Sequence, residues 1–203
     1  MNVFTEPQEV LRILDGLQCD WGVAGGWAID LFLDRITRKH QDIEVAIFRE
    51  DQLILQRHLS SRGWSLEYVR NGQLMPWSAE ECLELPIHEI WCRIRTGPLR
   101  RIEVLLNERE ANAFIFRRDF RIMAPINRTF VRSNSGIRVL APEIVLLYKS
   151  KGPTEPKEQQ DFSNMVDALD MERRQWLIES ISAIDPEHRW LAALRGPHSG
   201  QAS

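Results

Sequence analysis

The stretch from Gly25 to Val45 reads GGWAIDLFLDRITRKHQDIEV and joins a glycine pair, a helical pattern and two acids. Glycine lets the backbone approach a bulky anion closely and adopt a positive φ. A helix that begins directly after it aims unpaired N–H groups at that anion. Gly25 and Gly26 therefore indicate a phosphate site just before the predicted helix.

Asp42 and Glu44 lead into the apolar run that follows, which predicts a β-strand over 42–48. Alternate side chains of a strand share a face, so both carboxylates would point one way. At about 4 Å and an effective dielectric near 20, their repulsion is roughly 4 kcal/mol. Mg²⁺ relieves such repulsion and completes its shell with water and phosphate oxygens. The pattern favours a site for a metal-bound nucleoside triphosphate over a solvated strand edge.

The order of glycine pair, helix and RKHQDIEV at 38–45 resembles the nucleotidyltransferase superfamily that includes DNA polymerase beta. The most similar branch holds the aminoglycoside and lincosamide nucleotidyltransferases and their bacterial relatives. The resemblance covers the N-terminal half and returns in LAPEIVLLYK at 140–149 and KEQQDF at 157–162.

This resemblance implies transfer of a nucleoside monophosphate, AMP from ATP, to a hydroxyl of a small molecule such as an aminoglycoside-like antibiotic, with release of pyrophosphate. It implies two Mg²⁺ ions as cofactors, held by three carboxylates that are also the catalytic residues: Asp42, Glu44 and Glu103. The residues that it implies at the phosphates of ATP are Gly25, Gly26, Arg38, His40 and Lys149.

Two residues depart from the pattern of the superfamily. Trp27 follows the glycines where many members have serine, so a hydroxyl contact to phosphate is missing. Glu44 stands in place of aspartate and lengthens the reach of that ligand by one methylene.

Other interpretations of the site residues remain open on the sequence. Glu103 is a lone acid in the apolar run RRIEVLL, and buried unpaired acids are rare. It faces a cation or water, or it forms an ion pair with Arg101. His40 contacts phosphate or has a hydrogen-bonded structural role. Lys149 is favoured at a helix C-terminus by the helix dipole alone.

Composition excludes several classes of protein. The 203 residues are 43% hydrophobic and 27% charged, as in globular proteins. The net charge of −3 lacks the basic surplus of a nucleic-acid enzyme, so no nucleic-acid partner is expected. The three cysteines have no C-x-x-C spacing, which indicates reduced thiols in the cytoplasm. We expect neither a signal peptide nor a membrane span.

The sequence lacks the complete motifs of several other enzyme classes. His88-Glu89 begins like a zinc-protease motif, but the fifth residue is Cys92 and the segment is predicted to be a strand. The chain lacks a P-loop and a G-x-S-x-G elbow, and its five histidines form no ligand set. The basic run of Arg117, Arg118, Arg121, Arg128 and Arg132 contacts phosphates or is a solvated face.

The expected fold is α/β (α+β), with a short mixed sheet that carries the acids, flanking helices and a helical C-terminal region. We expect a catalytic domain over 1–140, the helical region over 141–196 and a disordered tail over 197–203. The breaker after Lys151, Gly152-Pro153-Thr154-Glu155-Pro156, is the clearest boundary signal.

Periodicity predicts helices near 7–18, 26–35, 51–62, 157–169, 171–183 and 187–194, with another that opens at 142. It predicts strands near 21–24, 42–48, 64–69, 87–95, 99–106, 114–116 and 136–140. We interpret 71–86 as a loop with a short central helix. Its acids and Trp77 form either a wall for a cationic acceptor or a solvated loop with a core tryptophan.

Two other functions compete with the transfer reaction. One is the nucleotidyltransferase component of a toxin–antitoxin pair, which would modify a protein. The other is a non-catalytic module that only binds a nucleotide or a partner.

Overall fold

A mixed sheet of ten strands forms the centre of the fold, in a computed structural model that describes residues 4–152 and 155–196. The main path runs β4-β3-β5-β6-β2-β1-β10-β9, and β7 pairs with β6 and β8. The strands are β1 (Trp21–Val23), β2 (Glu44–Phe48), β3 (Ser65–Arg70), β4 (Gln73–Pro76), β5 (Glu89–Arg93), β6 (Arg101–Glu110), β7 (Ala113–Ile115), β8 (Met123–Pro125), β9 (Phe130–Arg132) and β10 (Arg138–Leu140).

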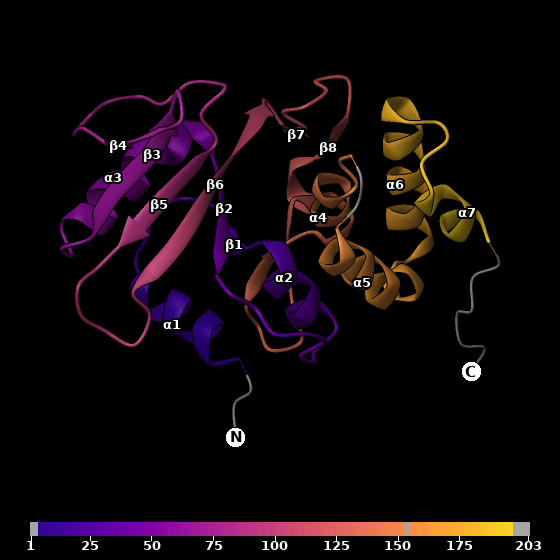
Figure 1. Cartoon of the computed structure of the whole chain (residues 1–203), viewed down its shortest axis with the longest axis horizontal. Coiled ribbons are helices and arrows are strands. Elements are labelled where there is room, and N and C mark those ends of the chain that lie inside the picture. Colours follow the sequence, from indigo (N-terminus) through magenta and orange to yellow (C-terminus); the bar gives the residue numbers. More distant parts are fainter. Residues whose placement is uncertain (1–3, 153–154, 197–203) are drawn as a thin grey trace.

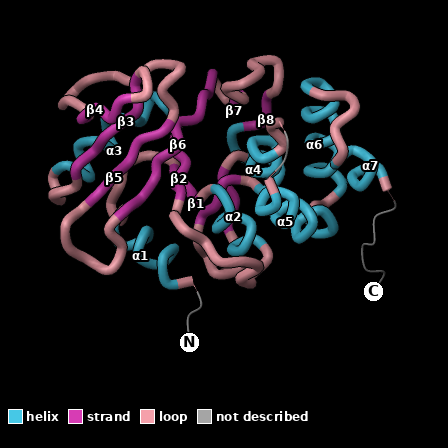
Figure 2. Tube along the Cα trace, viewed as in Figure 1, coloured by secondary structure: helices cyan, strands magenta, loops and turns pink. Residues whose placement is uncertain are grey.

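The helices lie around this sheet, and those of the C-terminal part gather beside it (Figures 1 and 2). Helix α2 packs against both α4 and α5, while α6 packs against α4 and α7. The helices are α1 (Thr5–Ile13), α2 (Gly25–Phe32), α3 (Gln52–Ser60), α4 (Pro142–Lys149), α5 (Pro156–Met165), α6 (Met171–Ile184) and α7 (Trp190–Arg195). The predicted mixed sheet flanked by helices is confirmed, and the division at 140 stays a prediction.

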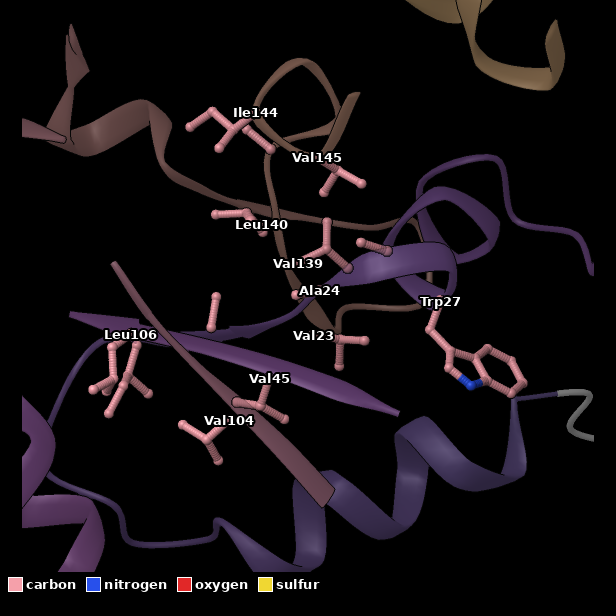
Figure 3. Close-up of a cluster of buried hydrophobic side chains, with 14 of the residues drawn as sticks. Val23, Ala24, Trp27, Val45, Val104, Leu106, Val139, Leu140, Ile144 and Val145 are labelled. Carbon is pink, nitrogen blue, oxygen red and sulfur yellow. The ribbon is translucent and has the colours of Figure 1, made fainter. Parts of the chain in front are cut away.

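A row of valines fixes the register at the centre of the sheet (Figure 3). Val23 of β1 pairs with Val45 of β2 and with Val139 of β10, and Val45 pairs with Val104 of β6. All four side chains are fully buried. A slip by one residue would turn this apolar row to the opposite face, so burial specifies the pairing strongly.

The segment 71–86 corrects the predicted short helix, because β4 forms a hairpin with β3 there. Asn71 and Gly72 at the turn have φ angles of 53° and 74°. An Asn-Gly pair with both φ values positive is the preferred two-residue hairpin turn. Trp77 is buried, and its indole N–H donates to the Glu81 carbonyl at 2.8 Å. It is a core tryptophan and not a wall for an acceptor.

Several element boundaries also differ from the prediction. Strand β2 begins at Glu44, so Asp42 lies in the loop before it and the two acids do not share one strand. Helix α1 ends at Ile13 rather than at residue 18, with Gly16 at a φ of 77° in the turn that follows. Strands β8 and β9 were not predicted.

The tail over 197–203 and the boundary residues Pro153 and Thr154 lie outside the described residues. Within the described ranges, every helix is too short or too polar to cross a bilayer.

Candidate active site

The start of α2 is built around glycine. Gly25 has a φ of 58°, and a Cβ atom added there would lie 1.4 Å from Glu44 Oε2. A Cβ on Gly26 would lie 2.1 Å from Arg38 Nη2 and 2.8 Å from His40 Cε1. The positive φ favours glycine at position 25, and a side chain at position 26 would displace Arg38 and His40. Side chains of this protein lie against the backbone at both glycines, and the predicted approach of a phosphate there stays a prediction.

The valine row brings two of the predicted acids together. Because Val45 pairs with Val104, the preceding residues Glu44 and Glu103 are direct partners on the parallel strands β2 and β6. The Glu103 N–H also donates to the Ile43 carbonyl at 3.0 Å. The two carboxylate-bearing side chains leave the sheet on the same face, opposite the buried valines.

Arg101 connects this pair with Asp42. Its Nη2 atom lies 3.0 Å from Glu103 Oε1 and 3.7 Å from Asp42 Oδ2. The ion pair between Glu103 and Arg101, which the sequence left as an alternative, is therefore formed. All three predicted carboxylates lie in one neighbourhood, since the charges of Asp42 and Glu44 both act on Glu103.

Burial and mutual repulsion shift the protonation of these acids. Burial raises the pKa of Glu103 to about 7, and the charges of Glu89 and Asp42 add to this rise while Arg101 opposes it. Burial also raises the pKa of Glu44, where the charge of Lys149 opposes the rise. Arg101 and Lys149 therefore offset only part of the effect of burial and mutual repulsion on these two acids.

This donor set fits a hard divalent cation in its chemistry. Carboxylate oxygens are the ligands that Mg²⁺ prefers, and the acids repel one another without a counter-ion. The guanidinium of Arg101 supplies part of that positive charge to Asp42 and Glu103. Over the described residues, no group of three or more His, Cys, Asp or Glu side chains is arranged to hold a metal ion as it stands.

Two predicted phosphate contacts meet at one buried acid. Arg38 donates to Asp161 Oδ1 at 2.7 Å and Oδ2 at 2.9 Å, and Lys149 Nζ lies 2.9 Å from Oδ2. The Asp161 side chain is fully buried. Burial acts to raise the pKa of Asp161, but the hydrogen bond from Arg38 and the charge of Lys149 lower it overall.

His40 has the structural partners that the sequence left open. Its Nε2 atom lies 2.6 Å from Asp30 Oδ2, and Thr37 Oγ1 donates to Asp30 Oδ1 at 2.5 Å. Trp27 stacks on the imidazole with ring centroids 4.3 Å apart. The tryptophan that replaces serine thus packs the loop between α2 and β2, which carries Arg38 and Asp42.

A cavity of about 610 Å³ joins these groups. Gly25, Gly26, Asp42, Glu44 and Lys149 line it. Glu103 lies beside this lining, on the strand next to Glu44.

The cavity also holds residues that sequence reasoning did not assign to the site. They are His88 and Glu89, Asn107 of β6, Arg117, Arg118 and Tyr148. Glu89 of β5 pairs with Leu105, which puts it on the same face of the sheet as Glu103. Only the strand order shows this, because the positions are far apart in the chain.

Residues 8–96 match the model of a family described as aminoglycoside-2''-adenylyltransferase. The predicted resemblance to the aminoglycoside and lincosamide nucleotidyltransferases is confirmed. The prediction of a nucleotidyltransferase enzyme is confirmed at the level of this family. None of the curated proteins matches the sequence.

Solved structures of adenylyltransferases have the same fold. The crystal structure of ANT(2'')-Ia with adenylyl-2''-tobramycin superposes with a TM-score of 0.59 at 18% identity, over 89% of this chain and 99% of that chain. The solution structure of ANT(2'')-Ia gives 0.58 at 18% identity, over 93% and 94%. The lincosamide adenylyltransferase LnuA with bound lincomycin gives 0.56 at 14% identity, over 80% and 96%. Identities this low show a shared fold, and the predicted fold class is confirmed.

Proposed function

We propose that this protein transfers AMP from ATP to a hydroxyl of a small molecule and releases pyrophosphate. The observation that carries the proposal is the pairing of Glu44 with Glu103 in register, beside the glycine start of α2. Lys149, whose charge acts on Glu44, supplies a cation on the same cavity. Carboxylates that can bind a metal ion lie next to groups that can bind phosphate. This combination favours phosphoryl-transfer chemistry.

The acceptor class rests on the family and on its neighbours. The ANT(2'')-Ia structure contains adenylyl-2''-tobramycin, and the LnuA structure contains lincomycin. Both are hydroxylated antibiotics. We infer that this chain acts on a hydroxylated small molecule of comparable size, such as an aminoglycoside-like antibiotic.

The acids Asp42, Glu44 and Glu103 would hold Mg²⁺, which neutralises phosphate charge and polarises the reacting oxygens when bound. Glu103 would take the proton of the acceptor hydroxyl as a general base. The negative charge on the transferred phosphoryl group would be stabilised by cations fixed before the reaction begins.

The phosphates of the donor would be bound by groups at the start of α2 and at the end of α4, which also line the cavity. The backbone N–H groups at Gly25 and Gly26 would point toward the phosphates, and Lys149 would neutralise them. Arg38 contacts the same Asp161 as Lys149, so one buried acid orients both cations. Most of the rate gain would come from this positioning.

Pyrophosphate release tests the proposal. The protein is incubated with Mg²⁺, ATP and a panel of aminoglycosides, lincosamides and other hydroxylated molecules. We expect release that depends on one class of acceptor and is lost in Glu103→Gln. Glu110→Gln, at the exposed end of the same strand, is the matched control. Pyrophosphate release that does not depend on the acceptor, or that is unchanged in Glu103→Gln, would argue against the proposal.

A further inference from the structure

Two consecutive arginines, Arg117 and Arg118, line the cavity but have no part in the proposed reaction. They follow β7, in the loop that leads to β8, and both guanidinium groups lie by the Tyr148 ring of α4. The distances from the guanidinium carbons to the ring centroid are 5.2 Å for Arg117 and 5.3 Å for Arg118. The same ring therefore positions both cations.

The ring is itself held in place. The Tyr148 hydroxyl donates to Asn107 Oδ1 at 3.0 Å, and Phe116 packs against the ring with centroids 4.9 Å apart. Arg118 Nη1 donates to the Tyr148 carbonyl at 2.7 Å, at the C-terminal end of α4. Strand, loop and helix thus fix the arginine pair before any ligand binds.

The arginine pair has no acid of its own. Over the described residues, no carboxylate lies within ion-pair distance of Arg117 or Arg118. Among the acids, the charge of Glu108 acts most on Arg117, but Arg49 binds this carboxylate at 2.7 Å through Nη2. The charge of Glu158 acts on Arg118, and the Glu158 carboxylate accepts a hydrogen bond from the Glu155 backbone N–H. Glu89 accepts a hydrogen bond from the Trp91 indole.

The environment makes this arrangement costly for the free protein. Burial lowers the pKa of Arg117 and of Arg118, and each guanidinium repels its neighbour. Arg117 is half-buried and Arg118 is exposed, and a bound anion would stabilise these two neighbouring like charges. A guanidinium binds phosphate or carboxylate through two parallel N–H groups, which gives direction as well as charge.

We propose that Arg117 and Arg118 form a subsite for an anionic group, phosphate or carboxylate, of a molecule bound in the cavity. This group belongs to the terminal phosphates of the nucleotide or to the acceptor. The choice between these two sources rests on the proposed function, whereas the anion subsite itself does not. An anionic acceptor would distinguish this chain from enzymes for purely polycationic antibiotics.

Calorimetry without turnover tests the subsite. The probes are inorganic phosphate and pyrophosphate, titrated without Mg²⁺ into the wild type and the double variant Arg117→Gln/Arg118→Gln. We expect affinity to fall about tenfold or more, as for the loss of charge-assisted hydrogen bonds. Arg121→Gln is the matched control, because Arg121 is in the same loop but is paired with Asp119 at 2.6 Å.

Further arms of the experiment separate the two sources. If the glutamine double variant binds a non-hydrolysable ATP analogue with Mg²⁺ more weakly than the wild type does, but binds AMP equally well, the subsite is assigned to the terminal phosphates of the donor. Unchanged affinity for the analogue, with loss of phosphate binding to the analogue-saturated protein, assigns it to the acceptor. The charge-preserving variant Arg117→Lys/Arg118→Lys should have a phosphate affinity between those of the wild type and the glutamine variant, because lysine keeps the charge but not the paired N–H groups. Melting curves check that each variant folds.

The proposal is overturned if the glutamine double variant binds every probe as Arg121→Gln does. It is also overturned if a folded lysine double variant loses as much affinity as the glutamine one, because the charge would then not be what binds. Neither result depends on catalysis, so a failure of the transfer reaction in the acceptor screen remains a separate finding.

Discussion

Glu103 forms an ion pair with Arg101 and also belongs to the acidic cluster of the site. The ion pair with Arg101 is present, yet the pKa of Glu103 is still about 7 because burial and the neighbouring acids outweigh that arginine. A carboxylate kept only for a salt bridge would be expected to have a lowered pKa. The balance therefore favours a functional role.

The pH dependence of stability follows from this shift. The pKa of Glu103 rises from its ordinary 4.5 to about 7, so the folded protein binds the extra proton between these values. Its stabilising contribution is present below pH 4.5 and is lost as the pH rises through 7. We expect Glu103→Gln to melt higher relative to the wild type at pH 8 than at pH 5. A variant that melts markedly lower at pH 8, yet still turns over, would assign Glu103 to structure.

Asp42 is the acid that can be removed with least harm to the fold. Its side chain is 42% exposed and lies 3.7 Å from Arg101. Asp42→Asn should abolish transfer and change the free energy of unfolding by less than about 0.5 kcal/mol, as for a surface substitution. Activity and melting temperature are measured together, with the exposed Asp15→Asn as control. Full activity in Asp42→Asn would contradict its role as a metal ligand.

At the scale of elements, Asp161 of α5 ties the loop after α2 to the end of α4. Its partners Arg38 and Lys149 are themselves 16% and 13% exposed, so these charges are largely out of water. The KEQQDF pattern in the sequence pointed to this segment, but Arg38 lies 123 residues from Asp161 in the chain. Only the packing of α2 and α4 on α5 brings them together.

Asp161→Asn should therefore destabilise the protein by about 3–5 kcal/mol, the effect of breaking a buried ion pair. The two cations would then repel each other, and a triphosphate would replace the missing negative charge. We expect a non-hydrolysable ATP analogue with Mg²⁺ to raise the melting temperature more in this variant than in the wild type. Asp167→Asn, at an exposed carboxylate, is the control. Equal shifts in both proteins would show that Arg38 and Lys149 do not meet the phosphates.

Element prediction succeeded where the local sequence dictates the structure. Pro142 and Glu143 open α4 as predicted, and α5, α6 and α7 lie close to their expected ranges. Strand β9 failed because its residues are defined by pairing with β10 and not by a pattern of their own. Asn71-Gly72 was a hairpin signal that the prediction overlooked. The same holds for the site residues. Asp42 and Glu44 could be assigned from the local sequence, Glu103 required the family resemblance, and Glu89 required the strand pairing.

At the scale of the whole molecule, the cavity is lined by residues from Ala24 to Gln160, with both acidic and basic side chains among them. Metal-free acids would repel the phosphates of ATP, and Mg²⁺ alone lacks phosphate oxygens to complete its shell. Each ligand should therefore strengthen the binding of the other, and linkage makes this coupling reciprocal. Calorimetry should give about fivefold or greater tightening of ATP by Mg²⁺. Equal ATP affinity with and without Mg²⁺ would favour the non-catalytic module.

The fate of the phosphates of ATP tests nucleotidyl transfer most directly. The wild type is incubated with Mg²⁺, the acceptor found in the screen, and ATP labelled at either the α- or the γ-phosphate. The account predicts that the α-label appears on the acceptor and the γ-label in pyrophosphate, and that Glu44→Gln loses both. A γ-label on the acceptor would mean phosphoryl transfer instead, and α-label transfer that persists in Glu44→Gln would remove the acid pair from the reaction.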